Sequence, residues 1–138
     1  RLLKNSVRQK LQEPNFLMLE IYLNKMKVEF HYLPEFERRA KALAKKYKSF
    51  RQDYDDFLDS LEKAPFQGTS LGGGVYKTRM QIVSKGKGKS GGARVLTYNL
   101  KKIEPDRISI TFLSIFDKSD MENVSDSYIK SLVKEAIL

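Results

Sequence analysis

Apolar and polar residues recur with two different periods along this chain, and the change of period predicts its elements. In residues 27–33 the side chains of Val28, Phe30 and Tyr32 alternate with polar ones, as in a strand with one buried face. In residues 34–47 apolar positions recur every three or four residues, which indicates an amphipathic helix. The same reasoning predicts, in order, strand 27–33, helices 34–47 and 50–61, strands 75–83, 93–100 and 107–116, and a last helix from 126 to 138.

This order, β-α-α-β-β-β-α, predicts an α+β fold: one mostly antiparallel sheet packed by a helical hairpin and a C-terminal helix. The strand 107–116 is apolar on both faces at its end, so we expect it inside the sheet. Ser49 and Ser125 are candidate N-caps of the second and third helices. Residues 64–74 are rich in glycine and predict a loop, and the Pro-Asp pair at 105–106 predicts a turn.

Residues 1–25 precede this pattern and form a segment of their own. Apolar residues lie four apart on one helical face before Pro14, which breaks the segment, so we expect two short helices. Met26 follows directly and has the place of a natural start. We therefore expect an N-terminal helical extension over residues 1–25 and one domain over residues 26–138. Whether the extension is native or added stays open.

The overall charge favours a polyanionic partner. The 138-residue chain has 26 Lys and Arg against 17 Asp and Glu, which gives a net charge of +9. Such a balance points to nucleic acid, the ribosome, an anionic membrane surface or an acidic protein. The absence of cysteine excludes disulfides and a thiol nucleophile, and His31 is the single histidine. The apolar runs are too short to span a membrane, and we expect a cytosolic protein without a metal or a small-molecule cofactor.

The stretch Val75–Leu100 concentrates the positive charge. It lies between Glu62 and Glu104, the nearest acids on either side, and contains no acid itself. A run this long without a carboxylate predicts a surface that meets phosphate. Its basic residues are Lys77, Arg79, Lys85, Lys87, Lys89 and Arg94.

Strand alternation divides these cations into two groups. Lys77 and Arg79 are two apart, so both project from one face of their strand as a fixed pair. Arg94 lies on the more apolar side of the next strand, where its charge either reaches solvent at the strand end or is held by a partner. The Gly-, Ser- and Lys-rich segment 84–92 predicts a mobile basic hairpin loop, with a solvated flexible turn as the alternative.

The sequence Gly88-Lys89-Ser90 is not expected to bind a nucleotide triphosphate. A phosphate-binding loop requires a glycine five residues before its second glycine, and here that position is Val83. Such a loop also leads into a helix, whereas residues 93–98 have the pattern of a strand.

Several segments, in order along the chain, resemble the RelE/ParE superfamily of bacterial toxin–antitoxin toxins, nearest to its RelE/HigB-like branch. The segments that carry the resemblance are Tyr76-Lys77-Thr78-Arg79, Gly88-Lys89-Ser90-Gly91-Gly92-Ala93-Arg94-Val95 and Tyr98. Residues 34–38 and 43–47 are similar to the family's first helix. The later landmarks are Pro65, Gly68, Lys118 and Val124-Ser125. The resemblance covers roughly residues 26–138 and implies the RelE fold.

For the catalytic branch of that family, the resemblance implies metal-independent cleavage of messenger RNA on the ribosome. The ribose 2′-OH attacks the adjacent phosphate and the 5′-oxygen leaves, while lysines and arginines stabilise the pentavalent phosphate. The residues that match the catalytic cations by position are Lys77, Arg79, Arg94 and Lys118. The residues expected to bind the RNA backbone are Lys85, Lys87 and Lys89 in the loop, and Arg38, Arg39 and Lys45 on the basic face of the first helix.

The resemblance also implies a cognate antitoxin whose acidic or apolar segment covers the basic face. The tyrosine found near the C-terminus of some active members has no clear match, because Tyr128 lies far into the expected last helix. Two other functions stay open. One is a ParE-like poison of DNA gyrase without nuclease activity, and the other is a non-catalytic RNA- or ribosome-binding module with the same basic hairpin.

Overall fold

The computed structural model describes Leu17, residues 27–102 and residues 107–138. The expected extension over residues 1–25, apart from Leu17, and the expected turn at 105–106 lie outside the described residues. The elements are β1 (Lys27–Tyr32), α3 (Pro34–Lys46), α4 (Phe50–Lys63), β2 (Thr69–Gly72), β3 (Val75–Met80), β4 (Ala93–Lys102), β5 (Arg107–Asp117), α5 (Asp126–Ile137) and the short 3₁₀ helices η1 (Val83–Lys85), η2 (Lys89–Gly91) and η3 (Lys118–Asn123). Within these ranges every helix is too short or too polar to cross a membrane.

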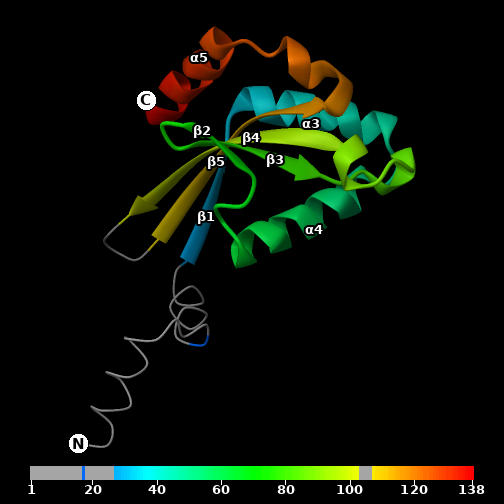
Figure 1. Cartoon of the computed structure of the whole chain (residues 1–138), viewed down its shortest axis with the longest axis horizontal. Helices are drawn as coiled ribbons and strands as arrows, with labels where there is room; N and C mark the ends of the chain where they lie inside the picture. Colours follow the sequence, from blue (N-terminus) through cyan, green and yellow to red (C-terminus); the bar gives the residue numbers. More distant parts are fainter. Residues whose placement is uncertain (1–16, 18–26, 103–106) are drawn as a thin grey trace, which may run out of the picture.

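A five-stranded sheet with the strand order β1-β5-β4-β3-β2 forms the centre of the fold (Figure 1). β1 runs parallel to β5, and the other neighbouring strands are antiparallel. β5 lies between β1 and β4, which confirms the interior position expected from its two apolar faces. The α+β class and the mostly antiparallel sheet are therefore as predicted.

The edge strand β2 occupies part of the segment that the sequence predicts as a loop. All four residues of β2 are exposed, so the segment has no alternation of buried and exposed positions that would mark a strand. The chain turns from β2 into β3 through Gly73 and Gly74, whose φ angles of +60° and +87° favour glycine. The prediction of a continuous loop over residues 64–74 was wrong for this reason.

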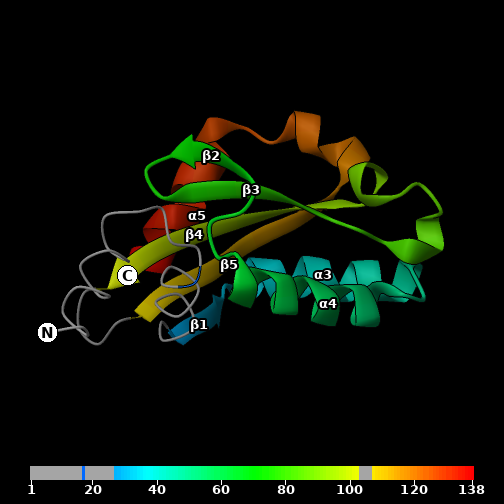
Figure 2. The same cartoon turned by 60° about the horizontal axis from the view of Figure 1, so that its bottom comes forward.

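Helices cover both faces of the sheet (Figure 2). The hairpin of α3 and α4 lies on one face, where Phe36 and Leu61 join a core cluster with Phe112 of β5. The helix α5 lies on the opposite face, where Leu132 packs in a second cluster with Leu96 of β4. Because successive side chains of a strand point to opposite faces, those of the central strands face the hairpin and α5 in turn.

The helix ends follow the local sequence. Pro34 is the first residue of α3, where its fixed φ suits the helix and its missing N–H has no cost. The hydroxyl of Ser125 accepts a hydrogen bond of 3.2 Å from the N–H of Tyr128, which confirms the predicted N-cap of α5. Ser49 stands at the start of α4, but its hydroxyl donates to the carboxylate of Asp53 at 2.6 Å instead of capping the helix backbone.

Candidate functional site

The strand cations Lys77, Arg79 and Arg94 share one face of the sheet. Arg79 of β3 is the register partner of Arg94 on β4, and Lys77 is the partner of Leu96. Since Leu96 belongs to the cluster under α5, strand alternation places all three cations on the α5 face. Lys77 is half-buried and Arg79 is exposed. The structure thus brings together the three strand cations that the sequence predicts as catalytic.

Backbone carbonyls hold Arg94, which is only 8% exposed. Its guanidinium donates to the carbonyl of Ser90 at 2.8 Å and to that of Ala93 at 3.1 Å. Burial, and then the positive charge of Arg79, lower the pKa of Arg94 from its ordinary value. In the described residues no acidic side chain forms an ion pair with Arg94, Arg79 or Lys77. The charges of these three side chains are therefore not neutralised by a carboxylate in the described part of the chain.

The loop between β3 and β4 contains η1 and η2, and it keeps one of its three lysines inside the fold. The ammonium of Lys85 lies 2.8 Å from Oδ1 of Asp117, and the two side chains are only 11% and 12% exposed. The sequence predicted Lys85 to be one of three mobile loop lysines. This prediction was wrong for Lys85, because Asp117 holds its side chain inside the fold. Lys87 is exposed, and the side chain of Lys89 lies outside the described part of the chain.

Asp117 receives hydrogen bonds from several directions. Burial raises its pKa, but hydrogen bonds from Lys85, Tyr47 and the backbone of Ser119, with the charge of Lys85, outweigh burial and lower the pKa of Asp117 to about 2. The hydroxyl of Tyr47 donates to Oδ2 at 2.7 Å. The carboxylate thus stays ionised at neutral pH and joins the end of β5 to α3 and to the loop.

The sequence Gly88-Lys89-Ser90 leads through η2, which has three residues, into the strand β4, so the strand expected after this motif is confirmed. Across the described ranges, no group of three or more His, Cys, Asp or Glu residues is placed to hold a metal ion.

Lys118, the fourth predicted catalytic cation, approaches the same end of the sheet. It is the first residue of η3 and is exposed. Its backbone N–H donates to the carbonyl of Gly92 at 3.1 Å, and Gly92 lies two residues before Arg94. The backbones that carry Arg94 and Lys118 are therefore tied together. Lys77 lies two residues before Arg79 on β3, so it stands roughly 7 Å further from this end of the sheet than Arg79 does.

The basic residues predicted on the first helix separate in the structure. The guanidinium of Arg39 lies 4.1 Å above the ring of Phe116, and its Nε donates to the carbonyl of Ile115 at 2.7 Å. Because Phe116 is the register partner of Arg94, Arg39 continues the row of cations beyond β5. Arg38 forms an ion pair with Glu35 beside it, whereas Lys45 is exposed near the end of α3.

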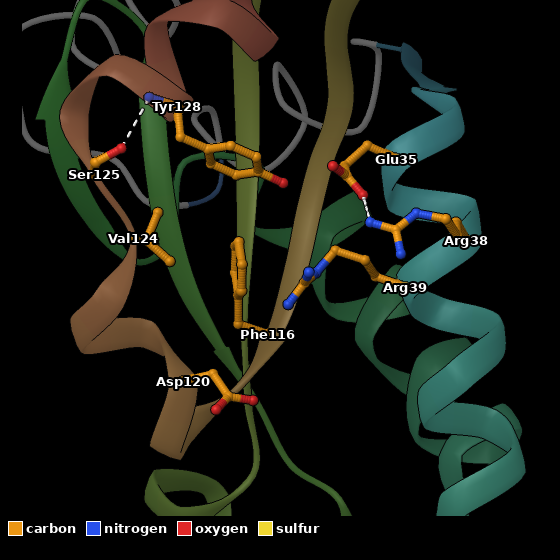
Figure 3. A pocket seen from close by; sticks show the side chains of 8 residues that line it. All are labelled: Glu35, Arg38, Arg39, Phe116, Asp120, Val124, Ser125 and Tyr128. Carbon is orange, nitrogen blue, oxygen red and sulfur yellow. Dashed lines mark hydrogen bonds and ion pairs between the residues drawn. The ribbon is translucent and has the colours of Figure 1, made fainter.

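An open cavity of about 540 Å³ lies between α3 and α5 (Figure 3). Its lining residues are Glu35, Arg38, Arg39, Phe116, Asp120, Val124, Ser125 and Tyr128. Burial raises the pKa of Glu35, but hydrogen bonds from Arg38 and Tyr128 and the charges of Arg38 and Arg39 outweigh burial and lower it. The cavity wall on the α3 side therefore carries an ionised carboxylate next to two guanidinium groups.

Tyr128, which we expected far into the last helix, lies in the first turn of that helix. It is the third residue of α5, and its ring points into the cavity, 6.0 Å from the ring of Phe116. Its hydroxyl lies 3.3 Å from Oγ of Ser114, and burial raises the pKa of Tyr128. The predicted N-cap at Ser125 was the signal that would have found it, because a cap there puts residue 128 in the first helical turn.

Comparison with known proteins gives the family. The model of the family described as RelE toxin of the RelE/RelB toxin–antitoxin system matches residues 36–137. A search of curated proteins finds no match. The matched range begins in α3 and ends at the last residue of α5, so it includes every cation of the sheet face. The chain therefore belongs to the RelE toxin family, the toxins of RelE/RelB toxin–antitoxin systems.

Proposed function

We propose that this toxin is an endoribonuclease that cleaves messenger RNA on the ribosome and so inhibits translation. The observation that carries the proposal is the register pair of Arg79 and Arg94 on the α5 face of the sheet, without a paired carboxylate in the described residues. Two adjacent guanidinium groups repel each other, and a phosphate that binds between them relieves that repulsion. RNA is the polyanion that this arrangement fits, given the family.

In this mechanism the RNA supplies its own nucleophile. The ribose 2′-oxygen gives up its proton and bonds to the adjacent phosphorus, the bond to the 5′-oxygen breaks, and that oxygen takes up a proton. The products are a 2′,3′-cyclic phosphate and a 5′-hydroxyl end. The protein stabilises the extra negative charge of the pentavalent phosphate, and one well-placed donor contributes about 100- to 1,000-fold in rate.

The four cations take different parts in this proposal. Arg79 and Arg94 hold the non-bridging oxygens, because a guanidinium offers two parallel donors to a phosphate. Lys77 and Lys118 approach from the two sides of the pair and are the candidates for moving protons. Of these two lysines, Lys77 is the half-buried one and Lys118 is exposed.

The remaining basic residues would bind the RNA backbone around the cleaved bond. Lys87 lies in the loop and Lys45 on α3, both exposed, and Arg39 lies on the cavity wall. We propose the same role for Lys89 and Arg38. Family membership implies an antitoxin partner, and we propose that an acidic or apolar segment of that antitoxin covers the same basic face.

The test compares two double variants with the same loss of charge. Lys77→Ala with Arg79→Ala removes two site cations, and Arg51→Ala with Lys134→Ala removes two exposed cations from α4 and α5. Each is induced in growing cells, and each purified protein is mixed with ribosomes and messenger RNA. We expect growth arrest and cleaved message from the parent and the control, and neither from the site variant.

Three results would contradict the proposal. If the site variant cleaves as well as the parent, Lys77 and Arg79 are not catalytic residues. Intact message together with DNA-damage signalling favours a gyrase poison. Ribosome binding without a cleaved product favours a non-catalytic module.

A further inference from the structure

The ion pair of Lys85 and Asp117 joins three segments that are distant in the sequence. Its Nζ–Oδ1 distance is 2.8 Å, and Lys85 also donates to the carbonyl of Gly92 at 3.3 Å. Oδ2 of Asp117 accepts the 2.7 Å hydrogen bond from Tyr47 at the end of α3. The pair thus links the loop after β3, the end of β5 and the first helix.

The same pair lies next to two of the proposed catalytic cations. Asp117 directly precedes Lys118 in the sequence. The carbonyl of Gly92 accepts from both Lys85 and the backbone N–H of Lys118, and Gly92 lies two residues before Arg94. Arg94 in turn donates to the carbonyl of Ser90 in the same loop. A shift of the ion pair would therefore move both cations.

The packing around Gly92 leaves the segment little room to relax. A Cβ atom built there would lie 2.1 Å from the carbonyl oxygen of Met80 and 2.9 Å from the backbone nitrogen of Ile82. The loop backbone therefore contacts the end of β3 directly. On the other side, the carbonyl of Gly92 is held by the ammonium of Lys85.

Stability alone is a poor explanation for such a pair. Taking two charges out of water is costly, and two apolar side chains of the same volume often stabilise a fold as well or better. What an apolar pair lacks is the set of directed hydrogen bonds to Gly92 and Tyr47. The contribution of the charged pair is therefore geometric.

We propose that Lys85 and Asp117 are positioning residues that fix the separation of Arg94 and Lys118 around the scissile phosphate. This inference rests on the proposed nuclease function. It gives Lys85 a part in the reaction other than contact with RNA.

The test uses Lys85→Met, Asp117→Asn and the double variant, with kcat and KM for ribosome-dependent cleavage and the midpoint of urea unfolding. Each single variant leaves one buried group without its partner and should unfold more easily. The double variant has no unpaired buried charge, so its midpoint should return toward that of the parent. Its kcat should stay lower by about 100-fold, because a displacement of about 1 Å at a reacting centre has that effect, while its KM should match the parent.

Glu29→Gln is the matched control. It breaks the ion pair between Glu29 of β1 and Arg107 of β5, which lies at the far end of the sheet from Arg94. We expect an easier unfolding and an unchanged kcat. A double Lys85→Met/Asp117→Asn variant with a parental kcat would overturn the proposal. An unchanged kcat with a raised KM that rises further with salt would also overturn the proposal, because that result assigns Lys85 to RNA binding.

A second readout is independent of cleavage. The hydrogen exchange of the Arg94 guanidinium, followed by NMR, should be faster in the double variant and unchanged in Glu29→Gln. Unchanged exchange in the double variant also overturns the proposal. If the parent does not cleave messenger RNA on ribosomes, the proposed function fails, and this exchange measurement still decides whether the pair positions Arg94.

Discussion

Arg79 and Arg94 stand directly opposite each other on neighbouring antiparallel strands, and the positive charge of the first contributes to the lowered pKa of the second. Like charges in this position destabilise a sheet. Arg79→Met should therefore keep or raise the melting temperature, while ribosome-dependent cleavage falls by about 100-fold or more because a phosphate donor is lost. Thermal unfolding and cleavage rates on the same preparation test this. A variant that is both less stable and less active would show that Arg79 supports the fold instead.

The exposed Lys87 offers a test of RNA contact without loss of a structural ion pair. Removing one phosphate contact lowers the slope of log K against log salt by roughly 0.7 for single-stranded RNA. We expect Lys87→Ala to bind ribosome-associated message more weakly and with a shallower salt dependence by that amount. Lys63→Ala, which removes an exposed lysine at the end of α4, is the control. Equal slopes for the two variants would exclude Lys87 from the RNA surface.

The lowered pKa of Asp117 predicts how the free energy of unfolding changes as the pH falls. Its pKa of about 2 in the folded protein is below the usual value of 3.8, so the folded state favours the ionised form. This contribution is fully present above the unfolded pKa and is lost as the pH falls toward 2. It amounts to about 2 kcal/mol. Urea unfolding at a series of pH values should show a smaller loss on acidification for Asp117→Asn than for the parent. Parallel curves for the two proteins would contradict the lowered pKa.

The close packing around Gly92 predicts that a larger side chain just before β4 destabilises the fold. In Gly92→Ala the new Cβ would meet backbone atoms of Met80 and Ile82, which cannot rotate away as a side chain does. We expect a loss of about 1–3 kcal/mol in the free energy of unfolding, as for overpacked sites. Gly88→Asn is the control, because its φ of +69° suits asparagine and nothing lies within 4 Å of a Cβ there. Equal stability of the two variants would contradict the close approach.

Local patterns predicted most of the fold, because its elements are long and periodic. The alternation in residues 107–116 and the caps at Pro34 and Ser125 depend on neighbouring residues alone, and the structure confirms them. The strand β2 escaped prediction because its four residues are all exposed. An edge strand of this kind is defined by its partner β3, and a local pattern does not contain that partner.

The site was predictable only in part, for a similar reason. The spacing of Lys77 and Arg79 places them on one face wherever the strand lies. The role of Lys85 depends on Asp117, which is 32 residues away, and its Gly- and Lys-rich surroundings read as a solvated loop. The position of Tyr128 over Phe116 depends on how α5 crosses the sheet, which periodicity does not give.

The hydrogen bond from Arg39 to the carbonyl of Ile115 has a consequence for solubility. Pairing between β1 and β5 ends at Tyr32 and Phe112, so the last residues of β5 have no strand on that side in the described structure. An open edge of this kind can recruit a strand from another molecule and begin aggregation. Arg39 occupies one hydrogen-bond acceptor of this edge, the carbonyl of Ile115, and its charged guanidinium lies against the edge. A residue expected to bind RNA thereby also covers part of the open edge of β5.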